Sequence, residues 1–186
     1  MIEVDVDPFG AATVAAPRVV TPVVPSRAGE PIRLTLPYPP SANRYWRTRV
    51  IVPKGKDLKS AIVSTYVSSE AKQFKEAVGW LLRSAGVRQP MQGRVAVHIE
   101  LWPHRPLDWA KRAKSDPLYW ADTVQRLDLD NARKVVNDAL KDLAFGDDKC
   151  IWRDSGEVME PDGRDACLVV TITPLVKVNP QLEIAA

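Results

Sequence analysis

The order in which hydrophobic patterns follow one another most constrains the fold of this chain. Alternating apolar and polar residues predict half-buried strands, and an apolar stripe with a period near 3.6 residues predicts amphipathic helices. In chain order, the patterns give a strand at 32–36, a helix at 69–85, a strand at 95–101, a helix at 130–143, and strands near 150–158 and 166–173. This β-α-β-α-β-β order predicts an α+β domain of two layers, in which two helices pack on one mixed β-sheet.

The first predicted helix carries recognisable signals at both ends. Ser68 precedes the helical pattern and is a preferred N-cap residue, and Gly86 follows the last apolar position. Before this helix, residues 37–47 read as a Pro-rich loop and residues 52–59 as a basic segment. After the following strand, residues 103–127 are expected to form a long polar connection.

Proline is concentrated near the N-terminus of the chain. Eight of the sixteen prolines lie at or before Pro40. Because proline fixes φ and donates no backbone hydrogen bond, we expect residues 1–30 to form a flexible extension. Residues 176–186 are expected to form a short tail, so the ordered domain is predicted to span residues 31–175.

Composition excludes several classes of protein. No apolar stretch approaches the roughly 20 residues that a membrane span requires, and the acidic N-terminus is unlike a secretory signal peptide. We therefore expect a cytoplasmic protein with no membrane partner, in which Cys150 and Cys167 are reduced thiols. The glycines form neither nucleotide-binding fingerprint, so no nucleotide cofactor is expected, and His98 and His104 lack zinc-finger spacing.

A cluster of acidic residues at the second predicted helix carries most of the chemical information. Asp128 and Asp130 are two positions apart on an extended segment, so their carboxylates point the same way. Lys134 follows Asp130 by one helical turn, and Asp147 and Asp148 come after the helix. Hard oxygen ligands of this kind suit Mg²⁺ or Mn²⁺, and a carboxylate-bound metal beside a lysine suits phosphodiester hydrolysis.

The same residues also have a purely structural interpretation. Asp130 is a suitable helix cap, Asp130 and Lys134 are an ordinary i,i+4 pair, and Asp147 and Asp148 are common turn residues. A D-x-D-N motif is too short to decide between the two interpretations. From the residues alone, both remain open.

Three segments in order resemble the RusA family of Holliday junction resolvases. They are LPYPPSANRYWR at 36–47, DLDNARKVVNDAL at 128–140 and GDDKCI at 146–151. The resemblance covers residues 32–175 and leaves both ends of the chain outside. It implies a RusA-like fold and a metal-dependent endodeoxyribonuclease.

The resemblance also implies roles for individual residues. Those that correspond to the metal ligands of the family are Asp128, Asp130 and Asp148. They imply Mg²⁺ as the cofactor, with Mn²⁺ as a substitute. Lys134 corresponds to the essential lysine of the family, and Asp147 matches a second acid of the later turn.

The family consists of small homodimeric endonucleases of phage and prophage origin that nick four-way DNA junctions symmetrically. The resemblance therefore implies branched DNA as the substrate, a homodimer, a role in DNA recombination and repair, and a place in the cytoplasm of a bacterial host. Two alternatives stay open: a non-catalytic protein that binds branched DNA, and a small DNA nuclease without preference for junctions.

Basic residues in the two connecting segments are candidates for contacts with DNA phosphates. They are Arg44, Arg47, Lys54 and Lys56 in the first segment, and Lys111, Arg112, Lys114 and Arg126 in the second. Trp46, Trp109 and Trp120 lie among them and are candidates for base stacking, although tryptophan is more often a packing residue. The alternative interpretation is that these basic residues lie on two ordinary solvated loops and contact no DNA.

Two departures from the family pattern concern these DNA contacts. Leu127 stands where family members often have a basic residue, with Arg126 one position earlier. The connection at residues 103–127 is also longer than in compact relatives.

The length of the second helix limits how Asp148 meets the first two aspartates. About fourteen helical residues span about 21 Å, whereas five extended residues span at most about 18 Å. Asp148 therefore approaches Asp128 and Asp130 only if the chain turns back tightly, if the helix ends early, or if a partner subunit shares the site. Sharing across a homodimer is a hypothesis at this point.

Overall fold

The central sheet of this protein has four strands that run in mixed directions. The computed structural model describes residues 30–55 and 57–175. The strand order is β1 (Ile32–Pro37), β6 (Cys167–Leu175), β4 (Arg94–Trp102) and β5 (Ile151–Val158). β4 and β5 are parallel, whereas the pairs β1–β6 and β6–β4 are antiparallel. The predicted mixed sheet is confirmed.

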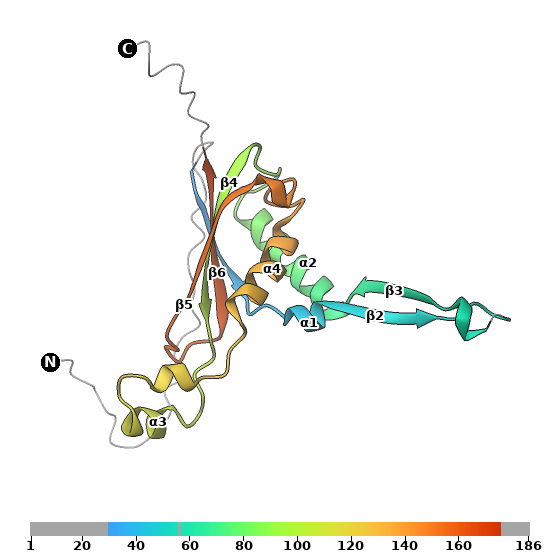
Figure 1. Cartoon of the computed structure of the whole chain (residues 1–186). Coiled ribbons are helices and arrows are strands. Elements are labelled where there is room, and N and C mark those ends of the chain that lie inside the picture. Colours follow the sequence, from blue (N-terminus) through green and yellow to red (C-terminus); the bar gives the residue numbers. More distant parts are fainter. Residues whose placement is uncertain (1–29, 56, 176–186) are drawn as a thin grey trace, which may run out of the picture.

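Two helices, α2 (Ser69–Ser84) and α4 (Leu129–Leu140), cover one face of this sheet (Figure 1). Val97 and Ile99 of β4 belong to the core beneath them, and both are 0% exposed. Residues that alternate with them point to the opposite face, where Glu100 pairs with Arg33 of β1 at 2.6 Å. The two-layer α+β architecture is therefore confirmed, and burial of apolar surface between the layers is its main source of stability.

The start of α2 follows its sequence closely. The Ser68 hydroxyl oxygen accepts a hydrogen bond from the backbone N–H of Ala71 at 3.2 Å, which confirms the predicted N-cap. Phe74 and Val78 form part of its buried face. The helix ends one residue before its predicted limit, and Gly86 follows it with a φ of 79°.

The C-terminal end of α4 differs from the prediction. The helical pattern extends to residue 143, but the helix ends at Leu140. Asp142, with a φ of 64°, then turns the chain, and its backbone N–H donates to the carbonyl of Phe145 at 2.8 Å. Phe145 is 0% exposed. The chain has to turn after Leu140 for the Phe145 ring to be buried. The prediction that the helix continues to residue 143 was wrong for that reason.

A two-stranded hairpin that the sequence analysis did not predict projects away from the sheet and helices (Figure 1). It consists of β2 (Trp46–Ile51) and β3 (Ile62–Val67), which pair antiparallel, and the short helix α1 (Ala42–Tyr45) precedes it. Every residue of β2 is exposed, so no buried face imposes a readable alternation. The loop prediction for 37–47 was wrong for this part, and Lys56 lies outside the described residues.

The predicted polar connection at 103–127 contains two helical segments. They are α3 (Trp109–Ser115) and the 3₁₀ segment η2 (Trp120–Thr123). The rings of Trp109 and Trp120 lie 6.2 Å apart, and both residues therefore help to hold this connection together. Two further 3₁₀ segments, η1 (Leu58–Ser60) and η3 (Asp148–Cys150), complete the order of elements.

The remaining expectations about the chain have different outcomes. The predicted extension at 1–30 and tail at 176–186 lie outside the described residues, apart from Glu30. Neither Cys150 nor Cys167 forms a disulfide within the described part of the chain. Within the described part of the chain, no helix has the length and apolar character needed to cross a membrane.

A close approach between β4 and β5 gives a prediction about stability. A Cβ added at Gly156 would lie 2.7 Å from Cγ1 of Ile99, its register partner in β4. Gly156→Ala should therefore lower the free energy of unfolding by about 1–3 kcal/mol, as overpacked cores do. Gly146→Ala is the matched control, because a Cβ at Gly146 meets nothing within 4 Å. Equal urea midpoints for the two variants would contradict the prediction.

Candidate active site

A depression of about 480 Å³ lies beside α4 and is lined mainly by polar and charged side chains. Its lining comes from β2, α4, η3 and β5, and consists of Trp46, Lys134, Asn137, Asp138, Asp148, Ile151 and Asp154. Two of the four predicted catalytic residues, Lys134 and Asp148, therefore line one depression. The other two, Asp128 and Asp130, lie at the N-terminal end of the same helix.

Asp128 is the N-cap residue of α4. Its Oδ1 atom accepts hydrogen bonds from the backbone N–H groups of Asp130 at 3.0 Å and Asn131 at 3.1 Å. The structural interpretation of this motif had assigned the cap to Asp130, and that assignment was wrong by two positions. Because both bonds use one carboxylate oxygen, the second oxygen of the exposed Asp128 is left for another ligand within the described part of the chain.

Asp130 and Lys134 form an ion pair across one helical turn. The ammonium nitrogen of Lys134 lies 2.7 Å from Oδ2 of Asp130. This hydrogen bond, together with the charge of Lys134, holds the pKa of Asp130 below its ordinary value. Both side chains are 61% exposed, so the pair contributes little to stability. Its main consequence is to place a cation directly beside an ionised carboxylate.

Asp154 of β5 faces the same part of α4. Asn137 donates a hydrogen bond to it at 3.2 Å, and Nε of Arg133 lies 3.7 Å from its other oxygen. Partial burial raises the pKa of Asp154, and the negative charge of Asp130 adds to that rise. Asp130 and Asp154 are therefore electrostatic neighbours, although they come from different layers of the fold.

Asp138 is held by a tyrosine from α1. The hydroxyl of Tyr45 donates a hydrogen bond to Oδ2 of Asp138, and Tyr45 is 1% exposed. Burial of the ring and the neighbouring carboxylate both raise the pKa of Tyr45 above its ordinary value. This bond ties the base of the hairpin to the helix that carries the candidate site.

The chain turns back after α4, which is one of the routes that the geometric argument allows. Nζ of Lys141 lies 3.4 Å from Asp147 and 3.9 Å from Asp148. Asp147 accepts a hydrogen bond from the backbone N–H of Lys149 at 3.0 Å, and this bond holds the pKa of Asp147 below its ordinary value. Asp147 therefore shapes the turn, while Asp148 faces the depression. A single chain thus places Asp148 in the depression that Lys134 lines, but not in one group with Asp128 and Asp130, so a site shared across a homodimer stays a prediction.

The side chains around Lys134 match the ligand type of the metal that the resemblance implies. The depression that Lys134 lines also holds the carboxylates of Asp138, Asp148 and Asp154, and carboxylate oxygens are ligands that Mg²⁺ and Mn²⁺ prefer. Among residues 30–55 and 57–175, no group of three or more His, Cys, Asp or Glu side chains stands close enough together to hold an ion. Side-chain chemistry fits the metal, but Asp128 and Asp130 at the start of α4 and Asp148 in η3 are not gathered at one point.

Sequence reasoning missed two residues of this site. Asp154 gave no signal, because an acidic residue in an edge strand reads as an ordinary exposed position. Asn137 lies in the helix that follows the D-x-D-N motif, but its role depends on the hydrogen bond that its amide donates to Asp154 of β5. Contacts between residues so distant in sequence leave no local pattern to find.

The predicted DNA-contacting residues are distributed over three regions. Arg47 lies exposed on the hairpin, and Lys111 and Lys114 lie exposed on α3. Arg44 lies 3.8 Å from Glu70, and Arg126 is exposed just before α4. Arg112 instead bonds to Asp108 at 2.9 Å and to Thr123 at 2.9 and 3.0 Å, so its guanidinium also holds the 103–127 connection together.

The family model that matches this chain and its individual relatives carry the same name. The family model described as Endodeoxyribonuclease RusA matches residues 37–184. A Crossover junction endodeoxyribonuclease RusA of Escherichia coli K12 is 30% identical over 103 residues, which cover 51% of this chain and 76% of the relative. Another, from Escherichia coli O139:H28, is 29% identical over 76% of this chain and 93% of its own length. A third, from Enterobacteria phage 82, is 28% identical over 103 residues.

The hydrogen bond between Tyr45 and Asp138 gives a prediction for the site's support. Tyr45→Phe leaves the partly buried carboxylate without its donor, so the free energy of unfolding should fall by about 1.5–3 kcal/mol. Tyr66→Phe on the exposed hairpin is the matched control and should change stability by less than about 0.5 kcal/mol. Chemical denaturation measures both. A Tyr45→Phe variant as stable as the control would mean that the hydroxyl bond adds nothing.

Proposed function

Because the chain belongs to the RusA family of endodeoxyribonucleases, we propose that this nuclease resolves four-way (Holliday) DNA junctions. It makes paired symmetric nicks during DNA recombination and repair. The observation that carries the proposal is the arrangement on α4, where Lys134 pairs with Asp130 and shares a depression with Asp148. Membership in a nuclease family removes the support for a non-catalytic binding protein.

The proposed metal ligands are Asp128, Asp130 and Asp148, with Mg²⁺ as the cofactor and Mn²⁺ as a substitute. When bound, the metal activates a water molecule and offsets negative charge on the phosphoryl oxygens. Three features support this assignment: an oxygen-only donor set, the uncommitted oxygen of Asp128, and the lowered pKa of Asp130, which keeps that carboxylate ionised.

Lys134 is the residue of this chain that acts directly at the phosphate. Its ammonium group is exposed and already lies beside an anion, so a DNA phosphate that enters the depression meets a positive charge. In the transition state of phosphodiester cleavage, negative charge grows on the phosphoryl oxygens, and a lysine at that position stabilises it. The amide of Asn137 and the guanidinium of Arg133 hold Asp154 in place nearby.

The hairpin supplies a basic surface for the DNA. Arg47 and Arg49 alternate to one face of the ribbon, opposite Tyr66 and Ser64 of β3. A two-stranded ribbon fits the major groove of B-form DNA, and arginine is suited to phosphate contacts. Trp46, at the base of the same ribbon, lines the depression, so DNA bound along the hairpin leads toward the site. Arg44, Lys111, Arg112, Lys114 and Arg126 are the other proposed contacts.

A homodimer is the proposed assembly. A four-way junction has two-fold symmetry, and an isologous dimer presents two equal sites to opposing strands. The relative from Enterobacteria phage 82 supports a phage or prophage origin and, with it, the cytoplasm of a bacterial host as the place of action.

Replacement of one proposed ligand tests the proposed function. Asp130→Asn should retain the fold and the affinity for a synthetic four-way junction, while cleavage slows by at least about 100-fold, because the metal loses a charged ligand worth several kcal/mol. Gel-shift and nicking assays on the same junction measure both quantities.

Asp142→Asn is the matched control for that test. Asp142 follows α4 with a φ of 64°, a conformation that asparagine adopts readily, so this variant should cleave like the wild type. Undiminished cleavage by Asp130→Asn would contradict the assignment. Equal cleavage of a junction and a linear duplex by the wild type would instead favour a nuclease without junction preference.

The hairpin surface is tested through the salt dependence of binding. The double variant Arg47→Ala/Arg49→Ala removes two phosphate contacts, so the slope of log K against log salt should become shallower by about 1.8. Thr48→Ala/Thr65→Ala, a register pair on the other face of the same ribbon, should leave the slope unchanged. An unchanged slope for the arginine variant would remove this face from the interface.

A further inference from the structure

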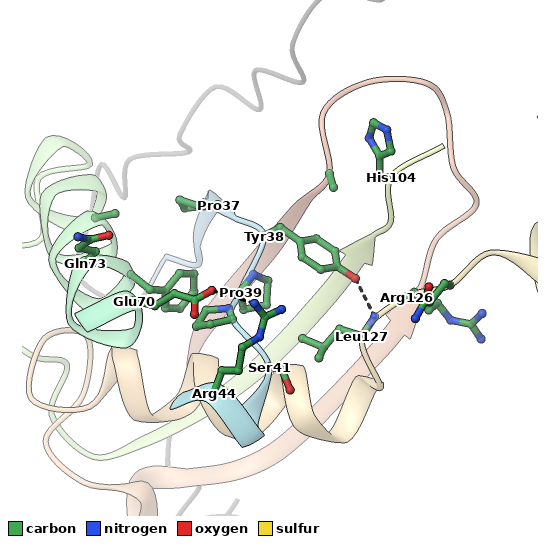
Figure 2. A pocket seen from close by; sticks show the side chains of 15 residues that line it. Pro37, Tyr38, Pro39, Ser41, Arg44, Glu70, Gln73, His104, Arg126 and Leu127 are labelled. Atoms are coloured by element: carbon green, nitrogen blue, oxygen red, sulfur yellow. Dashed lines mark hydrogen bonds and ion pairs between the residues drawn. The ribbon is translucent and has the colours of Figure 1, made fainter. Parts of the chain in front are cut away.

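A cavity outside the candidate active site lies near the start of α4, where residues 125–127 form part of its lining. It measures about 840 Å³, within the range of small-molecule sites. Figure 2 shows its walls: the segment 37–41 after β1, the start of α2, and residues 125–127 before α4. None of the proposed metal ligands, nor Lys134, belongs to its lining, whereas two of the proposed DNA contacts, Arg44 and Arg126, do.

The cavity is joined directly to the segment that carries the catalytic aspartates. The backbone N–H of Leu127 donates a hydrogen bond to the hydroxyl of Tyr38 at 2.9 Å (Figure 2). Leu127 lines the cavity, and Asp128 is the next residue, with its Cα about 3.8 Å further along the chain. A ligand in the cavity therefore lies close to Asp128, one of the proposed metal ligands.

The lining combines flat apolar walls with polar edges and positive charge. Tyr38 and Pro39 supply the apolar wall, and Gln73 and Gln125 supply amide groups that both donate and accept hydrogen bonds. Arg44 and Arg126 outweigh Glu70, the only acidic residue of the lining, which lies 3.8 Å from Arg44. This is the chemistry that receives a base against an aromatic ring and a phosphate beside arginine.

We propose that this cavity holds one unstacked nucleotide of the DNA strand that is cut, the nucleotide that flanks the scissile phosphate. The proposal rests on the proposed function, since it takes branched DNA as the substrate. Bases near a branch point are the least costly to unstack, because part of their stacking is already lost. The base lies along Tyr38 with its edge at Gln73 and Gln125, and its phosphate lies toward Arg126.

The experiment places 2-aminopurine, whose emission rises when it unstacks, at successive positions beside the mapped cleavage point of a four-way junction. Binding uses the Asp130→Asn protein, so that the DNA stays intact. Emission should rise at one flanking position. Ala77→Trp fills the cavity from α2 and should abolish this rise and weaken junction binding by at least about fivefold, the lower limit of one lost base stack.

Two further variants keep the test interpretable. Glu76→Trp adds the same indole at the preceding, exposed position of α2, outside the cavity, and should retain both the emission rise and the affinity within about twofold. Gln73→Trp reaches the cavity from an exposed position, so it repeats the blockade without disturbing the core if Ala77→Trp fails to fold.

The outcomes separate this inference from the proposed function. If the wild type cuts the junction but no flanking position shows increased emission, or if the filled cavity leaves the increase intact, the nucleotide pocket is overturned and the nuclease assignment stands. If the wild type neither binds nor cuts the junction, both are overturned.

Discussion

The cap that Asp128 forms on α4 determines where the chemistry of this protein lies. Two backbone N–H groups at the start of the helix bond to one oxygen of this side chain, which fixes both the first turn and the direction of the carboxylate. From that point, helical geometry alone places Asp130 and Lys134 on consecutive turns. The Asp128 side chain therefore caps the helix with one carboxylate oxygen and presents the other oxygen at the positive end of the helix dipole.

The turn after α4 is the second constraint on the site. Phe145 must enter the core, so the helix stops at Leu140 and the chain reverses through Asp142. This reversal carries Asp148 back to the depression that Lys134 lines. A longer helix, as the apolar pattern alone predicts, would carry Asp148 away from it. Core packing thus decides the position of a polar residue that takes no part in the core.

Local sequence patterns predict the parts of the fold that have one buried and one exposed face. The strand β4 and the helices α2 and α4 show such patterns, and the two-layer α+β class follows from the order of the elements, whereas the strand order within the sheet does not. The hairpin of β2 and β3 has no buried face and gives no pattern, although its register is regular. At the site, Asp130 and Lys134 are visible in the sequence because they are one turn apart, whereas Asp154 reaches them only through the packing of β5 beside α4. The metal ligands and DNA contacts stay predictions.

The measurement that tests this account most directly is a Mg²⁺ titration of wild-type cleavage on a four-way junction, with a linear duplex of the same sequence in parallel. The account predicts no cleavage with the metal chelated, a junction-cleavage rate that rises to saturation with Mg²⁺, paired nicks at symmetric positions, and little cutting of the duplex. Cleavage that persists without any divalent metal, or equal rates on the two substrates, would contradict it.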